Sequence, residues 1–110
     1  MTMYYDLYGS REMDIHELQR AVANAIEVSF TRRNNLAYDD YYKADLPDPK
    51  SIRVVRNLLS DYGEEEVMEP AFEDRPVLLF VDGFEFAAEL EKALMRIPGL
   101  ELLRRKARPD

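Results

Sequence analysis

The sequence contains no cysteine, which excludes disulfides, thiolate nucleophiles and cysteine-based zinc or iron–sulfur sites. Long hydrophobic runs are also missing. The longest fully apolar stretch, Val77–Val81, is far shorter than the ~20 residues that a membrane-spanning helix needs. The chain does not open with a cationic segment followed by an apolar one, and we therefore expect no signal peptide. These absences predict a cytoplasmic protein with no membrane partner.

Side chains that usually carry catalysis are scarce. His16 is the single histidine, and its neighbours Asp14 and Glu17 are better explained as caps of a helix that begins there. The four glycines form no phosphate-binding loop, and no serine stands in a G-x-S-x-G context. The many carboxylates lack the spacing of a calcium loop. We expect no enzyme activity, no metal site and no cofactor.

The net charge of −7 is concentrated in the middle of the chain. Residues 36–74 carry 11 acidic and 4 basic side chains, whereas the rest of the chain carries 11 of each. A negative field of this kind repels nucleic acid and attracts a basic partner. The simpler interpretation, that these charges only solvate surface loops, stays open. We expect Arg53, Arg56, Arg104 and Arg105 to pair with acidic side chains of this region.

A chain of 110 residues, 46% of them apolar, has the size of one globular domain, which we expect to span residues 1–110. Hydrophobic periodicity and turn residues predict its elements. The expected strands are 3–8, 28–33, 36–43, 51–59, 77–81 and 100–106, and the expected helices are 14–27 and 84–96. Residues 51–59 fit a helical period as well as a strand period, and their β-branched side chains favour the strand.

The segment SDYGEEEVMEPAFED at residues 60–74 holds seven acidic residues and no basic one. This composition predicts an acidic surface loop or a poorly ordered segment near residues 60–75. The elements around it predict an α/β (α+β) fold: a two-layer sandwich with a mostly antiparallel sheet and two helices on one face, in the order β-α-β-β-β-β-α-β. The arrangement resembles a ferredoxin-like sandwich with an added central hairpin.

Tyrosines are interleaved with acidic residues in the same central region. Alternation along a strand over 36–43 would put Tyr38 and Tyr42 on one face and Tyr41 on the other. One face could belong to the core, but an exposed tyrosine beside carboxylates is also typical of a protein-recognition surface. The residues that we expect to bind a partner are Tyr38, Asp39, Asp40, Tyr41, Tyr42, Asp61, Tyr62, Glu64, Glu65, Glu66 and Glu69.

Four stretches carry a family resemblance: YYDLYG, MDIHELQRAVANAIEV, AYDDYYKA and PVLLFVDGFEFAAELEKALMRIPGLELLRR. As a pattern of elements they resemble small immunity proteins of bacterial toxin systems, including those of contact-dependent growth inhibition. The resemblance implies a cytosolic protein that neutralises a cognate toxin by tight binding, without an activity of its own. It assigns no individual residue a role.

Two functions from different classes follow as hypotheses. The first is an immunity or inhibitor protein, an antitoxin that binds a basic toxin such as a nuclease through the acidic, tyrosine-bearing surface. The alternative is a small non-catalytic ligand-binding or regulatory domain, homodimeric through a sheet edge. An enzyme with a carboxylate site is the least favoured possibility.

Overall fold

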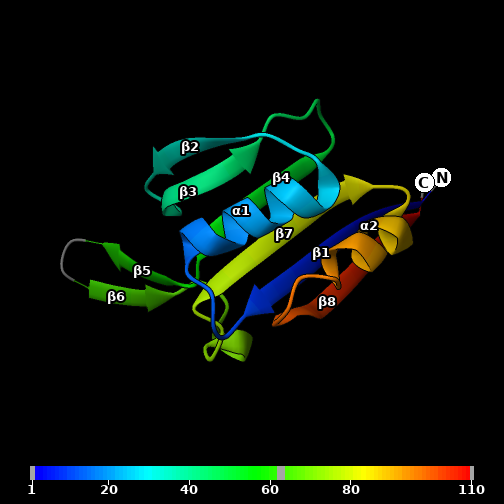
Figure 1. The fold of residues 1–110 in the computed structure, drawn as a ribbon. Coiled ribbons are helices and arrows are strands. Elements are labelled where there is room, and N and C mark those ends of the chain that lie inside the picture. Colours follow the sequence, from blue (N-terminus) through cyan, green and yellow to red (C-terminus); the bar gives the residue numbers. More distant parts are fainter. Residues whose placement is uncertain (1, 62–63, 110) are drawn as a thin grey trace.

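The computed structural model describes residues 2–61 and 64–109, which form a sheet, two helices and a separate hairpin (Figure 1). The main sheet has six strands: β1 (Thr2–Ser10), β2 (Phe30–Asn35), β3 (Asp39–Ala44), β4 (Ser51–Arg56), β7 (Val77–Phe84) and β8 (Leu100–Pro109). The helices are α1 (Ile15–Ile26) and α2 (Ala87–Leu94), and a short 3-10 turn, η1, covers Pro70–Phe72. The hairpin consists of β5 (Leu58–Asp61) and β6 (Glu64–Val67).

The main sheet is antiparallel throughout, in the order β2-β3-β4-β7-β1-β8. Strand β7 lies between β1 and β4, which are therefore parallel to each other. Likewise, β1 lies between β7 and β8. The two interleaved β-α-β units make a ferredoxin-like core, and the β2–β3 hairpin extends it at one edge. The predicted α+β fold and element order of the main sheet are confirmed, with both helices on one face (Figure 1).

Helix α1 begins where the sequence predicts, because its capping box forms. The backbone N–H of Glu17 donates to Asp14 Oδ1 at 2.8 Å, and the Asp14 N–H donates to Glu17 Oε1 at 3.2 Å. These bonds satisfy donors that the first turn of a helix leaves unpaired. Ile15, Leu18 and Val22 then lie on one buried face against the sheet.

Both faces of the sheet carry buried side chains. On the helix side, Tyr8, Val54 and Leu79 pack with α1 and α2 residues in the main core. A smaller cluster on the opposite face contains Leu7, Tyr41, Val55 and Leu78, with Tyr38, Met68, Phe72, Phe80 and Leu103 packed against it. Strand β7 contributes alternate residues to each cluster. This two-sided burial explains the unbroken apolar run at residues 77–81.

The prediction of an acidic loop near residues 60–75 needs correction, because strands occupy part of that segment. Residues 58–61 and 64–67 pair as the antiparallel strands β5 and β6, and η1 follows them. Strand boundaries also differ from the prediction: β3 begins at Asp39 rather than residue 36, and β7 continues to Phe84. Because β7 is longer, α2 begins only at Ala87. Phe86, which falls within the expected helix 84–96, precedes α2 and is 71% exposed.

Candidate functional site

The acidic hairpin β5–β6 is anchored by one buried side chain at its base. Asn57, only 2% exposed, donates from Nδ2 to the carbonyls of Phe72 and Arg75 at 2.8 and 2.9 Å. Its Oδ1 accepts from the Glu69 N–H at 2.8 Å, and its own carbonyl accepts from the Met68 N–H at 2.7 Å. The hairpin therefore leaves the main sheet and returns to it at fixed points.

Acidic residues occupy the part of the hairpin farthest from this base. The strand register pairs Asp61 with Glu64 and Ser60 with Glu65, and Glu66 has an exposed side chain. Figure 1 shows the hairpin projecting beyond the end of the main sheet. From residue 57 to residue 74 the sequence has no basic residue. The hairpin thus extends a segment of one charge sign away from the body of the protein.

Several predicted contact residues fall in the hairpin, and the structure describes some of them more fully than others. Tyr62 lies outside the described residues. For Asp61, Glu64 and Glu65 only the strand positions are described. Leu58, at the base of the hairpin, is 50% exposed although it is apolar. It pairs in register with Val67 on the neighbouring strand.

The three central tyrosines do not share the faces that alternation predicted. Tyr38 precedes β3 in the turn, where its N–H donates to Asn35 Oδ1 at 2.8 Å. Its ring packs edge-on against Tyr41, with centroids 5.1 Å apart, in the cluster opposite the helices. Tyr42 instead lies on the helix side, with its hydroxyl 2.8 Å from His16 Nδ1. The expected grouping of Tyr38 with Tyr42 is therefore wrong.

Tyr38 and Tyr41 are structural as well as surface residues. Tyr41 is 8% exposed and belongs to the buried cluster. The Arg53 guanidinium lies over the rings of both Tyr38 and Phe80, 5.1 and 5.0 Å from their centroids. It donates to the Tyr38 hydroxyl and, at 2.9 Å, to Asp82. Burial raises the pKa of Asp82, although the nearby Arg53 charge opposes the shift.

The remaining predicted carboxylates are engaged within the fold. Hydrogen bonds from Asn34 and Arg32, at 2.9 and 3.2 Å, lower the pKa of Asp40. Arg104 binds both carboxylate oxygens of Glu69, at 3.1 and 3.3 Å. Asp39 is half-buried and has a left-handed backbone conformation, with φ 55°. The acidic candidates that extend from the fold are thus those of the hairpin.

The predicted pairing of arginines with the acidic region is only partly correct. Arg104 pairs with Glu69, as predicted. Arg56 donates to the backbone carbonyl of Asp40 at 3.1 Å rather than to an acidic side chain, and Arg53 pairs with Asp82, outside the region. Arg105 instead binds Asp6 and Glu91, outside that region. On the sheet face opposite the helices, a groove of about 300 Å³ is lined by Tyr5, Phe80, Arg53, Arg104, Lys106 and Arg108 among others. Asp6 and Asp82 also line this groove, so its lining holds four basic and two acidic residues.

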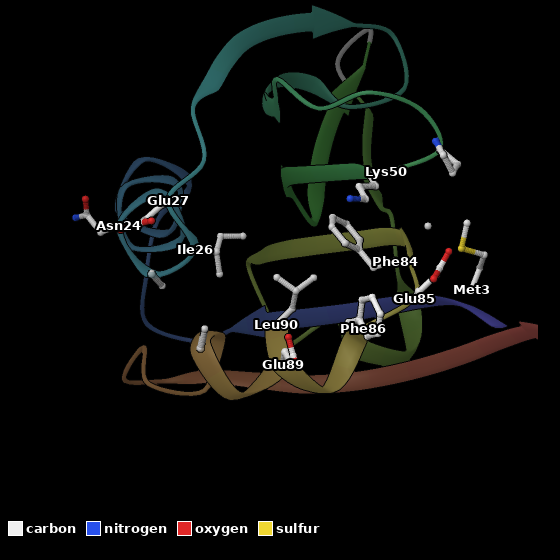
Figure 2. A pocket seen from close by; sticks show the side chains of 14 residues that line it. Met3, Asn24, Ile26, Glu27, Lys50, Phe84, Glu85, Phe86, Glu89 and Leu90 are labelled. Atoms are coloured by element: carbon white, nitrogen blue, oxygen red, sulfur yellow. The ribbon is translucent and has the colours of Figure 1, made fainter. Parts of the chain in front are cut away.

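A larger cavity, which sequence reasoning missed, lies between the helices and one end of β7. It measures about 670 Å³. Figure 2 shows Ile26 of α1, Leu90 of α2 and Phe84 of β7 pointing toward one another across it. Its lining comes from β1, the end of α1, the loop before β4, the end of β7 and α2. No contiguous motif could have revealed it, although the spacing Phe84, Phe86 and Leu90 is an apolar signal.

The described ranges contain neither a cluster of metal-binding side chains nor a membrane-spanning helix. Within residues 2–61 and 64–109, no three histidine, aspartate or glutamate side chains are grouped to hold a metal ion. In the same part of the chain, no helix is long and apolar enough to cross a membrane. Comparison of the sequence with protein-family models and with curated proteins gave no match.

Proposed function

We propose that this protein is a cytoplasmic immunity protein that neutralises a basic protein toxin by binding it with the acidic hairpin β5–β6. The observation that carries the proposal is the anchored projection of that hairpin, which Asn57 fixes by hydrogen bonds on both sides of its base. A disordered acidic tail would pay an ordering cost on binding. A hairpin held in place avoids much of that cost.

In this proposal, the acidic residues of the hairpin affect association, and its apolar surface affects dissociation. The acidic strands attract a positively charged partner over a distance, which raises the rate of encounter. Leu58, half-exposed at the base, supplies apolar area that becomes buried once contact is made. Apolar anchors of this kind slow dissociation, whereas exposed charges mainly affect association.

A nuclease is the toxin class that fits this surface best. Nucleic-acid-binding enzymes carry lysine and arginine along the path of the phosphate backbone. Closely spaced acidic residues supply negative charge like that of the phosphate backbone and can bind the same basic surface. The hairpin contributes four acidic residues within its eight strand positions, at 61 and 64–66.

The engagement of candidate catalytic groups within the described part of the chain supports an inhibitory rather than catalytic role. The single histidine, His16, is engaged with the Tyr42 hydroxyl. The chain has no cysteine, and Asp40 and Glu69 bind arginines within the fold. None of these groups is arranged as a nucleophile with its base.

Growth protection tests this proposal. The toxin domain encoded beside the gene of this protein is expressed in a bacterium together with wild-type protein or with the variant Glu65→Lys/Glu66→Lys. We expect growth with the wild type and loss of protection with the hairpin variant. A control variant, Glu27→Lys/Asp48→Lys, changes the net charge equally at exposed sites near the opposite end of the strands from the hairpin. Failure of the wild type to protect, or equal protection by both variants, would contradict the proposal.

A further inference from the structure

The cavity between the helices has the size and lining of a ligand site. Its volume of about 670 Å³ lies within the range of about 300–1,000 Å³ that is typical of small-molecule pockets. Ile26, Phe84 and Leu90 are part of the main core's half-buried surround, so they form an apolar floor. Phe86 adds an aromatic ring at the rim, 71% exposed to solvent.

The charged groups that line this cavity are mostly negative. Glu27, Glu85 and Glu89 contribute three carboxylates, and Lys50 contributes the one ammonium group in the lining. Figure 2 places Lys50 beside Phe84, and its Nζ lies 5.8 Å from the centroid of that ring. The Lys50 ammonium group thus already lies over the Phe84 ring in the cavity. Such a site favours positive over negative ligands.

In one wall of the cavity, two backbone segments pack closely together. Gly83 has φ 80°, and a Cβ atom at this position would lie 2.2 Å from the Pro49 carbonyl oxygen. The loop before β4 is therefore pressed against the backbone of β7. A preformed wall reduces the cost of binding a small molecule.

The rim continues on the other side of Phe86. Glu85, Phe86 and Glu89 also line a smaller hollow of about 280 Å³, together with Tyr4 and Arg105 among others. Arg105 is committed to Asp6 and Glu91, at 2.8 Å from each. Phe86, Glu85 and Glu89 therefore line the border between the cavity and this hollow.

We propose that this cavity binds a small hydrophobic ammonium compound. The apolar body of the ligand occupies the floor at Ile26, Phe84 and Leu90. Its ammonium group lies beside Phe86, within reach of Glu85 and Glu89. An aromatic ring with carboxylates is the environment in which alkylammonium groups are recognised.

This site is independent of the proposed toxin contact. In the β4–β7 ladder, Arg56 pairs with Val77 at the end that leads into the acidic hairpin, whereas Ser51 pairs with Asp82 at the cavity end. The two sites therefore lie at opposite ends of the same strands. Failure of one proposal leaves the other standing.

Three probes with one apolar body test the ligand class. They are 4-phenylbutylammonium, 4-phenylbutanol and 4-phenylbutyrate, titrated into the ¹⁵N-labelled full-length protein and followed by NMR. We expect the amine to bind most tightly, the alcohol more weakly and the carboxylate least, with shifts centred on residues of the cavity. Methylammonium at equal concentration should produce no such shifts, because it lacks the apolar body.

Variants of Glu85 and Glu89 then test whether these carboxylates recognise the ammonium group of the ligand. Glu85→Gln/Glu89→Gln should weaken binding of the amine roughly three- to tenfold and leave binding of the alcohol unchanged. Unchanged alcohol binding also shows that the cavity of the variant is intact. The matched control Glu12→Gln/Glu66→Gln, at exposed positions toward the hairpin end of the protein, should alter neither ligand. The proposal is overturned if the carboxylate binds as well as the amine, if the amine shifts map outside the cavity, or if no probe binds at millimolar concentration.

Discussion

Asp6 carries a buried charge on a central strand of the sheet. It is 2% exposed, and its two carboxylate oxygens accept hydrogen bonds from Arg105 Nε and Nη2, each at 2.8 Å. Arg105 also contacts Glu91 at 2.8 Å, so the same guanidinium links β1, β8 and α2. A buried carboxylate is costly without such a partner, whereas the partly exposed arginine retains contact with water.

This asymmetry predicts that replacing Arg105 and replacing Asp6 lower the free energy of unfolding by different amounts. Arg105→Met should lower the free energy of unfolding by about 3 kcal/mol, because it strands the Asp6 charge in the interior. Asp6→Asn should cost less, and the double variant should recover part of the loss. Urea denaturation of the three variants measures this. Equal losses for the two single variants would contradict the explanation.

From the buried hydroxyl of Tyr8, we predict that the folded protein loses stability at high pH. Its side chain is fully buried, and this burial, reinforced by the charges of Asp6 and Glu91, raises the pKa of its hydroxyl well above 10.0. In the unfolded chain the hydroxyl ionises near pH 10, whereas in the folded protein it stays protonated. The unfolded state therefore binds fewer protons, and stability falls as the pH rises above about 10.

Replacing Tyr8 by Phe removes that titration. The free energy of unfolding of Tyr8→Phe should decline less steeply between pH 9 and pH 11 than that of the wild type. Denaturation curves across this range provide the measurement. Parallel curves for the two proteins would show that Tyr8 does not contribute to the alkaline transition.

At the scale of elements, the acidic hairpin depends on groups outside it. A two-stranded hairpin is marginal on its own in water. Here Asn57 bonds to Phe72 and Arg75, and Met68 and Leu59 lie in or against buried regions. The hairpin is thus stabilised by the segment that follows it, including η1.

Asn57→Ala should destabilise the protein by about 2–3 kcal/mol, because it leaves two carbonyls and one N–H of the hairpin base without their partner. Amide exchange should also accelerate in β5 and β6 more than in β1. Asn24→Ala, at an exposed position of α1, serves as the control and should change stability little. Equal melting of Asn57→Ala and wild type would refute the anchoring role.

Local signals predicted several elements correctly. The capping box at Asp14 and Glu17 and the apolar run at 77–81 are contained within short stretches of sequence, so α1 and the core of β7 could be predicted. Non-local contacts defeated the prediction elsewhere. Glutamates are poor strand formers, and the hairpin was missed because its anchoring partners lie up to 18 residues from Asn57.

The candidate site was predictable only in part, for the same reason. The position of Tyr38 was wrong because a turn stabilised by Asn35 delays the start of β3 to Asp39, which changes the alternation. The engagement of Asp40 and Glu69 by arginines depends on strand pairing that composition does not reveal. The cavity escaped notice because its lining comes from separate segments.

At the scale of the whole molecule, the acidic hairpin projects from a body that carries a mainly basic groove on one face of the sheet. The described protein extends 43 Å along its longest axis, and the acidic hairpin projects from one end of the sheet (Figure 1). The basic groove that includes Lys106 and Arg108 lies on the sheet face opposite the helices. Arg104 of this groove pairs with Glu69, two residues after β6, so a steering field would come from the acidic residues at positions 61 and 64–66.

Association kinetics test the central claim most directly. The rate of binding to the toxin is measured by stopped flow across a salt series for the wild type, Glu65→Lys/Glu66→Lys and Glu27→Lys/Asp48→Lys. If the hairpin steers the partner, the hairpin variant should associate about tenfold more slowly at low salt and show a shallower salt dependence. The control variant should stay within about twofold of the wild type. Equal association rates and salt slopes for the wild type and the hairpin variant would show that the hairpin is only a solvated surface feature.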